Sequence, residues 1–121
     1  GIPVNSLATE SQVISSMIQG ASWALFENRV LDRSYGTMLN PNLEWYKILM
    51  PTDMFEAVSI LTPVANLGNN TSTAGIGEPP SVPTLAAIAN AVFNATGARV
   101  RSLPITPDRM LAALAEARRR A

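Results

Sequence analysis

Glu78 is the residue whose type and surroundings most strongly suggest chemistry in this sequence. It is the acidic residue of a short stretch rich in glycine and proline, Gly75-Ile76-Gly77-Glu78-Pro79-Pro80. The glycines let the backbone approach a ligand closely, and the prolines stiffen the chain on the far side. Desolvation of a carboxylate in such a loop favours its protonated form and suits it to act as a general base. A solvent-exposed turn glutamate has the same local sequence, and the pattern alone favours that simpler interpretation.

Gln12 is the second candidate, because an amide can position an anion without competing for protons. It lies beside the N-terminus of an expected helix, about two turns before Gln19. Its side chain offers both a donor and an acceptor, which suits a group next to an oxyanion. A polar residue on the solvent side of an amphipathic helix is the simpler interpretation, and the spacing alone favours it.

The residue types that the sequence lacks narrow the chemistry further. There is no cysteine and no histidine, so the chain cannot build a thiolate metal site or supply the usual base near neutral pH. We therefore expect no metal-ligating residue in this chain. Any catalysis has to use carboxylates, amides, backbone groups, or a cofactor held partly by other segments of protein.

Charge and hydropathy argue against two classes of partner. The formal net charge is zero, so we expect no broad basic surface for nucleic acid or an anionic membrane. Arg118, Arg119 and Arg120 cluster near the end, where the pattern favours a solvated helix terminus over a binding patch. No apolar run approaches the roughly 20 residues of a membrane-spanning helix. Because the sequence begins with Gly1, we expect it to be a piece of a longer protein.

Three helices are expected to position these residues, and the first of them carries Gln12. Apolar residues recur at three- and four-residue steps from Ile14 to Leu25, which predicts an amphipathic helix. Thr9 or Ser11 is the expected N-cap. Gly20 inside this helix costs about 1 kcal/mol relative to alanine, which predicts that the helix packs closely against another element there.

The second and third helices follow the glycine loop. The second is expected to be capped by Ser81 and to end at Gly97 in a left-handed conformation. Its amide end would lie near the loop and favour an anionic ligand there. The third begins at Thr106-Pro107-Asp108, where a cap, a first-turn proline and an N-terminal acid occur in order.

Short strands are expected between these helices. Residues 28–39 have the pattern of a hairpin, and residues 55–61 alternate as a strand does. Residues 66–80 are the least regular part, and such a long loop is uncommon in a compact domain unless it is functional or disordered. The expected fold class is α+β, with three helices packed on a few short strands. Residues 1–121 would form one segment that is incomplete alone.

In their order along the chain, these motifs resemble the C-terminal part of the molybdopterin-binding large subunit in the xanthine dehydrogenase and aldehyde oxidase family of molybdenum hydroxylases. The resemblance extends from Asn5 to about Leu114. Its anchors are, in order, Gln12-Val13, Ile18-Gln19-Gly20, Ala24-Leu25-Phe26-Glu27, residues 39–43 with Tyr46-Lys47, residues 75–79, residues 89–92, Ala95-Thr96-Gly97 and residues 101–106. No single motif is decisive, but the ordered set and the family-like spacing between Gln12 and Glu78 are specific.

The resemblance implies that Glu78 is the catalytic base, which takes a proton from a hydroxyl on molybdenum so that the oxygen can attack an electron-poor carbon. Gln12 would hydrogen-bond a ligand of the metal. The substrate would be an aldehyde or an N-heterocycle, with water as the oxygen source. Four residues of the glycine loop would lie with their backbone against the pterin: Ala74, Gly75, Ile76 and Gly77.

The resemblance also implies a set of cofactors and partners. The cofactor would be molybdenum–molybdopterin in its cytosine dinucleotide form, with iron–sulfur clusters and FAD on other domains or subunits. The glycine-rich and cysteine-rich segments that hold these groups are not in this sequence, so the remainder of the molybdenum subunit and the iron–sulfur and flavin subunits are expected partners. The sequence does not decide between cytoplasm and periplasm. The alternative is a non-catalytic fragment, or a degenerate subunit that acts only in assembly.

Three positions depart from the family's usual pattern. Ser15-Ser16 stands where relatives usually have a pair of glycines, and Ala74 stands where lysine is frequent. Met54-Phe55-Glu56 replaces a more usual Pro-Glu-Ile type of sequence. These differences bear on loop geometry and substrate more than on Glu78.

Overall fold

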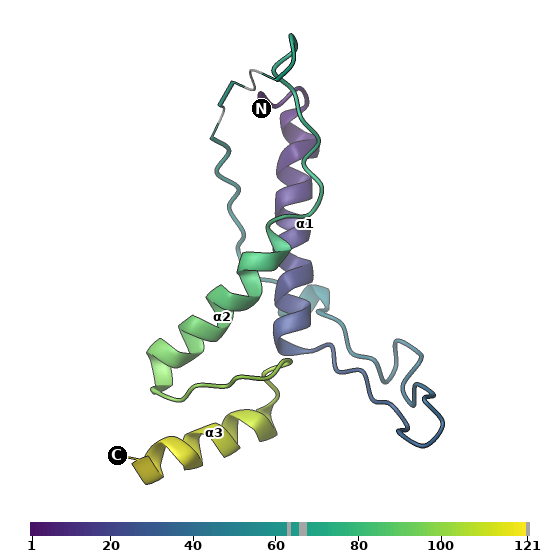
Figure 1. The fold of residues 1–121 in the computed structure, drawn as a ribbon, viewed down its shortest axis with the longest axis vertical. Helices are drawn as coiled ribbons and strands as arrows, with labels where there is room; N and C mark the ends of the chain where they lie inside the picture. The colour runs from purple at the N-terminus through teal and green to yellow at the C-terminus, as the bar shows by residue number, and fades with distance from the viewer. Residues whose placement is uncertain (63, 66–67, 121) are drawn as a thin grey trace.

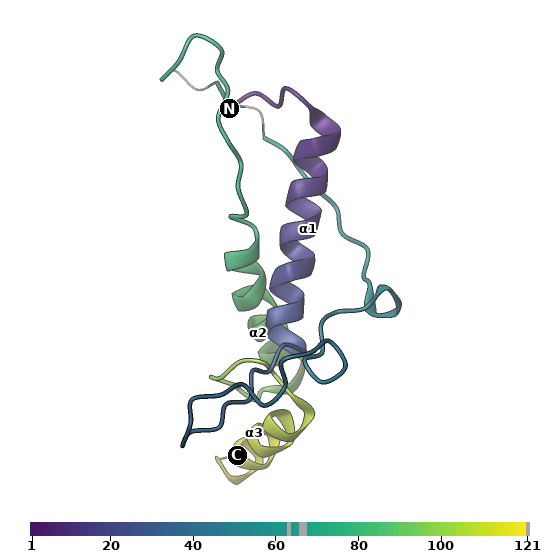
Figure 2. The same ribbon diagram turned by 90° about the vertical axis from the view of Figure 1, so that its right-hand side faces the viewer.

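Three α-helices make up most of the regular structure in the computed structural model, which describes residues 1–62, 64–65 and 68–120 (Figure 1). Helix α1 spans Ser6–Leu25, α2 spans Ser81–Thr96, α3 spans Pro107–Arg120, and η1 is one turn of 3-10 helix at Pro51–Asp53. Helices α1 and α2 pack against each other, and α3 lies toward the end of the molecule opposite the N-terminus (Figures 1 and 2). The three helices expected from the sequence are thus confirmed.

Helix α1 begins earlier than expected because Asn5 caps it. The Asn5 backbone is extended, and its Oδ1 accepts a hydrogen bond from the Ala8 amide at 2.9 Å. The prediction that Thr9 or Ser11 is the cap is therefore wrong. Instead the Thr9 hydroxyl donates to the Asn5 carbonyl oxygen at 2.8 Å. Asparagine satisfies the free N–H groups at a helix start as well as serine does, and the early start places Gln12 well inside the helix.

Gly20 lies where α1 and the first turn of α2 approach closely. A Cβ atom added there would stand 2.7 Å from the Ser81 carbonyl oxygen and 2.8 Å from the Thr84 Cβ. Both distances are too short for real side-chain atoms, so only glycine fits. The close packing that Gly20 indicated is confirmed. This contact presses the first turn of α2, and with it the end of the glycine loop, against the middle of α1.

We expect Gly20→Ala to destabilise the protein although alanine is the better helix former. Alanine gains about 1 kcal/mol in helix propensity, but its Cβ overlaps the Ser81 backbone, and overpacking of this kind typically costs about 1–3 kcal/mol. The measurement is thermal unfolding of the complete subunit, with Ser15→Ala on the exposed face of α1 as the control. Equal melting temperatures for the two variants would contradict this prediction, because they would show that α1 and α2 can move apart to accept the added Cβ without loss of stability.

The other helix ends follow the local signals of the sequence closely. Gly97 ends α2 with φ 68°, a left-handed conformation that glycine adopts readily. Helix α3 follows Thr106, and a side-chain hydrogen bond from Thr106 lowers the pKa of the Asp108 carboxyl. The start of α2 differs from the prediction. Pro80 occupies the cap position, and Ser81 is the first helical residue.

The short strands expected between the helices are largely missing from the part of the chain that the structure describes. Residues 28–39 do turn back on themselves, with one antiparallel bridge between Leu31 and Met38. Residues 55–61 contain no strand, so that prediction is wrong, because no described segment offers them a ladder partner. In the expected loop 66–80, residues 66 and 67 lie outside the described residues, and 68–80 contain neither helix nor strand. The expected α+β class is therefore correct only in its helices.

Polar contacts gather several segments around the C-terminal end of α1. The buried Ser22 accepts a hydrogen bond from the Leu49 amide at 3.0 Å, and the Ala24 carbonyl oxygen accepts one from the Ile105 amide at 2.7 Å. Nearby, the Tyr46 hydroxyl donates to Glu27 at 2.8 Å, and this hydrogen bond raises the pKa of Tyr46. This end of the molecule is therefore a structural junction, roughly half the length of α1 away from Gln12.

Small side chains form what core there is. The buried apolar residues among those described are Ala21, Ala24, Ala98 and Ile105. Large apolar side chains remain exposed, among them Ile60 at 86% and Val4 at 83%. Since folded proteins usually bury such residues, and exposed apolar patches mark contact surfaces, these side chains are available to further protein. No helix in the described ranges is long and apolar enough to cross a membrane.

Candidate functional site

Glu78 lies in the loop that leads into α2, immediately after a glycine that the loop requires. Gly77 has φ 58°, in the left-handed region where a residue with a Cβ is strained. The Glu78 side chain is exposed. The role of general base requires this carboxylate to be held off water, and the described residues of this chain do not provide that burial.

Gln12 reaches across from α1 to the same loop. Its Nε2 donates a hydrogen bond to the Gly77 carbonyl oxygen at 2.9 Å, which joins two residues 65 positions apart. The structure therefore joins Gln12 to Gly77, a second residue that the sequence analysis assigned to the site, and Gly77 directly precedes Glu78. Because a carbonyl oxygen can only accept, the contact also fixes the amide orientation, with the Gln12 nitrogen toward the loop.

Ser81 holds the loop on the other side of Glu78. The Glu78 carbonyl oxygen accepts hydrogen bonds from the Ser81 hydroxyl at 2.9 Å and from the Ser81 amide at 3.1 Å. Ser81 is itself buried and lies against Gly20. Sequence analysis did not assign Ser81 to the site, because its position before an apolar helix looks like that of a simple cap.

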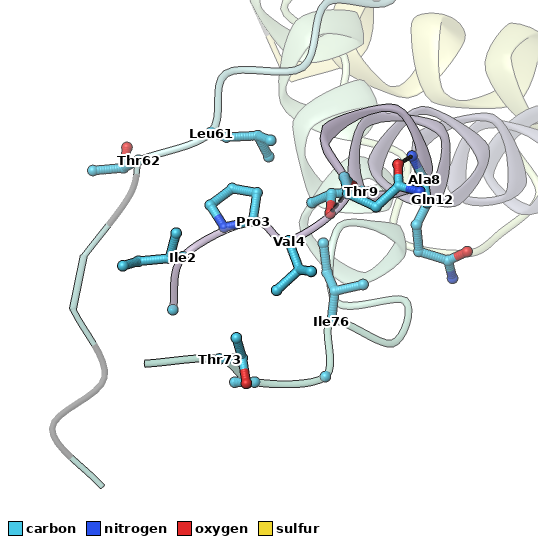
Figure 3. Close-up of a pocket in the computed structure, with 14 residues that line it drawn as sticks. Ile2, Pro3, Val4, Ala8, Thr9, Gln12, Leu61, Thr62, Thr73 and Ile76 are labelled. Carbon is cyan, nitrogen blue, oxygen red and sulfur yellow. Dashed lines mark hydrogen bonds between the residues drawn. The ribbon is translucent and has the colours of Figure 1, made fainter. Parts of the chain in front are cut away.

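A cavity of about 530 Å³ opens between the N-terminal end of α1 and the glycine loop (Figure 3). Its lining combines the segment 1–5 and the first turns of α1, including Gln12, with residues 73–76 and with Leu61 and Thr62. The Ile2 amide donates to the Ser72 carbonyl oxygen at 2.8 Å, which holds the N-terminal segment along the loop. Sequence analysis missed this segment, since Ile2-Pro3-Val4 carries no recognisable motif.

The predicted site residues are thus only partly brought together. Ala74, Gly75 and Ile76 line the cavity beside Gln12, as the close-up shows for Ile76 and Gln12 (Figure 3). Gly77 joins them through its hydrogen bond to Gln12, whereas Glu78 does not line the cavity. No group of three metal-ligating side chains occurs among the residues the structure describes.

The backbone of the loop is open enough to fit a flat ligand. A Cβ added to Gly75 would meet nothing within 4 Å, so the Gly75 backbone is accessible on the cavity wall. The φ angle of Gly75 is not in the left-handed region, so its role there is close approach rather than an unusual turn. These features suit a ring system that stacks on the peptide groups of residues 74–76.

Sequence comparisons connect the chain with molybdenum enzymes. Residues 1–55 match the family described as the molybdopterin cofactor-binding domain. The chain is 38% identical over 107 residues to the xanthine dehydrogenase molybdenum-binding subunit of Escherichia coli O157:H7, covering 88% of this chain and 14% of the relative. It is 36% identical over 109 residues to the aldehyde oxidoreductase molybdenum-binding subunit PaoC of Escherichia coli K12, covering 89% of this chain and 15% of the relative.

A solved structure shares the fold. The crystal structure of quinoline 2-oxidoreductase from Pseudomonas putida 86 aligns with a TM-score of 0.84 at 22% identity, covering 93% of this chain and 15% of that one. The chain spans 14% and 15% of the two curated relatives' lengths. The same helical arrangement therefore occurs inside a much longer polypeptide, which agrees with the many apolar side chains that stay exposed here.

Proposed function

The chain belongs to the xanthine dehydrogenase and aldehyde oxidase family of molybdenum hydroxylases, and we propose that it is the C-terminal segment of the molybdenum-cofactor-binding domain, which contributes the general base Glu78. The complete enzyme would oxidise an aldehyde or an N-heterocycle with oxygen from water. The observation that supports the proposal is the hydrogen bond from Gln12, which lines the cavity, to Gly77, the residue directly before Glu78.

The residues of the cavity wall would hold the cofactor. Ala74, Gly75 and Ile76 would lie with their backbone against the pterin, and Gly77 would close the same stretch. One hydrogen on the Gln12 amide nitrogen is used by Gly77, so its second hydrogen and its oxygen remain for a polar group of the cofactor. When bound, molybdenum–molybdopterin, in the cytosine dinucleotide form, supplies the oxidising equivalents and the place where water is activated.

Glu78 would accept a proton during the activation of water. Its carboxylate takes no part in the hydrogen bonds that hold the loop, since those use the backbone carbonyl oxygens of Gly77 and Glu78. The side chain is therefore free to bind and release a proton without disturbing the loop. The remainder of the molybdenum subunit would exclude water from it. Iron–sulfur clusters and FAD on partner domains or subunits would receive the electrons.

A substitution at Gly75 tests whether the cofactor lies against this loop. Gly75→Val should fold without backbone strain, because the φ of Gly75 is ordinary and its surroundings are open. The valine side chain would occupy the space of the pterin, so we expect a several-fold lower molybdenum content in the complete subunit. Elemental analysis provides the measurement, and Ala95→Val on the exposed face of α2 is the control. Full molybdenum content in Gly75→Val would exclude this wall as the cofactor site.

A further inference from the structure

We propose that Gln12 acts on the reaction through Glu78, as a positioning residue that fixes the peptide group between Gly77 and Glu78. This inference rests on the proposed function of Glu78 and adds a role to the cofactor contact proposed for Gln12. The direct observation is the hydrogen bond of 2.9 Å from Gln12 Nε2 to the Gly77 carbonyl oxygen. This carbonyl oxygen is part of the peptide group that joins Gly77 to Glu78.

The chain on the C-terminal side of Glu78 is stiff without any help from α1. Pro79 follows Glu78 directly, and a residue before proline is restricted to extended conformations. The Glu78 carbonyl oxygen is held by the hydroxyl and the amide of Ser81. Pro80, with its ring-fixed φ, then leads into α2. The backbone on this side of Glu78 is therefore restrained by Pro79 and Ser81.

Gly77 is a flexible joint directly before the base. Glycine has no Cβ and adopts positive and negative φ almost equally well, so the observed φ of 58° is only one of its available states. A flip of this residue would turn the peptide group before Glu78 and redirect the carboxylate. The Gln12 hydrogen bond opposes that flip, because it is lost when the Gly77 carbonyl oxygen turns away.

The two ends of this contact are tied to each other through the helices. Gln12 lies on α1, and Ser81 opens α2, while Gly20 of α1 lies against the Ser81 backbone. Three contacts therefore hold the backbone on both sides of Glu78 against α1 and α2, which we call the frame. They are the Gln12–Gly77 bond, the Glu78–Ser81 bonds and the Gly20–Ser81 contact. Such a frame matters for catalysis, because a displacement of about 1 Å in a reacting group can cost about 100-fold in rate.

Four variants of the complete, cofactor-loaded subunit test the proposal: Gln12→Met, which keeps the side-chain length but not the donor, Gln12→Ala, Glu78→Gln, and the double variant Gln12→Met with Glu78→Gln. The readout is the single-turnover rate of substrate oxidation. Gln12→Met and Gln12→Ala should each lower this rate about 10- to 100-fold. Gln19→Ala is the matched control, because Gln19 is an amide on the same helix with no side-chain hydrogen bond to the described residues.

The double variant separates positioning from a direct role of Gln12. If Gln12 acts through Glu78, Gln12→Met should lower the residual rate of Glu78→Gln by clearly less than it lowers the wild-type rate, since the group that it positions is already gone and only its cofactor contact is lost. An equal loss in both backgrounds would mean that Gln12 acts independently of the base and would overturn the proposal.

Amide hydrogen exchange gives a readout that does not depend on activity. In the cofactor-free subunit, Gln12→Met should speed exchange of the amides in residues 73–78 and leave α2 unchanged, whereas Gln19→Ala should change neither. Unchanged exchange in this loop would also overturn the proposal. If Glu78→Gln alone keeps wild-type turnover, the proposed function of Glu78 fails, and the exchange data still decide whether Gln12 restrains the loop.

Discussion

Glu78→Gln in the complete enzyme should leave molybdenum bound while turnover falls by several orders of magnitude. The amide has the size of the carboxylate but cannot take up a proton at neutral pH. General-base catalysis alone contributes about 10²–10⁴-fold, and a base coupled to formation of the nucleophile contributes more. The large loss is therefore expected from chemistry rather than from a disturbed fold.

The structure indicates that Glu78→Gln leaves the hydrogen bonds of the loop intact. The hydrogen bonds that hold the loop end on the backbone carbonyl oxygens of Gly77 and Glu78, so none of them requires the Glu78 carboxylate. The exposed side chain also leaves room for the amide. Molybdenum content and melting temperature should consequently match those of the wild type, which separates a catalytic defect from an assembly defect.

Steady-state and single-turnover kinetics, together with elemental analysis, provide the measurement. Glu44→Gln, which changes an exposed carboxylate outside the site, serves as the control and should keep wild-type turnover. Turnover of Glu78→Gln within about tenfold of the wild type, at normal metal content, would remove Glu78 from the mechanism. That outcome would favour the alternative in which this segment has only an assembly role.

The sequence predicted helix ends well where the signal is local and unique. Gly97 ends α2, and Thr106-Pro107 opens α3, because a left-handed residue or a first-turn proline has few alternatives nearby. At the start of α1, by contrast, Asn5, Thr9 and Ser11 are all competent caps. Asn5 is the residue that caps, and spacing alone does not rank such competitors.

The prediction of a strand at residues 55–61 was wrong for a different physical reason. Alternation of apolar and polar residues shows that a segment can pair, but a strand also requires a neighbour to complete its hydrogen bonds. The described chain offers no such neighbour, and Ile60 remains 86% exposed. Since the relatives are several times longer, we expect the remainder of the subunit to supply what residues 55–61 lack.

The residues of the candidate site could be identified from the sequence, but the contacts between them could not. Glu78 and Gln12 could each be singled out by residue type and local context, but nothing in their spacing shows that a side chain on α1 reaches a carbonyl 65 residues away. The loss of helix stability at Gly20 indicated close packing against another element, but the sequence did not say which one. The structure identifies the contact as Ser81. The described residues do not provide the burial that a general base requires at Glu78, so no local pattern could indicate it.

The 121-residue chain on its own should bind no molybdenum cofactor and should not behave as a stable monomer. Its buried apolar residues in the described ranges are three alanines and Ile105, while larger apolar side chains such as Leu7, at 79% exposure, face solvent. Burial of apolar surface is the main favourable contribution to folding, at about 25 cal/mol per Å². A chain that buries so little of its large side chains lacks most of that contribution.

The cofactor cavity gives an independent reason for the same expectation. Its walls come from the segment 1–5, the start of α1 and two stretches of irregular chain (Figure 3), and the cavity is partly open to solvent. A ligand held on one face forgoes most of the contacts that offset the entropy lost on binding. The experiment is to express this chain alone and the complete subunit in the same host, then compare molybdenum by elemental analysis and size by sedimentation. A monodisperse monomer of the isolated chain with stoichiometric molybdenum would contradict both lines of argument, since it would mean that one wall of the site and a core of small residues are sufficient.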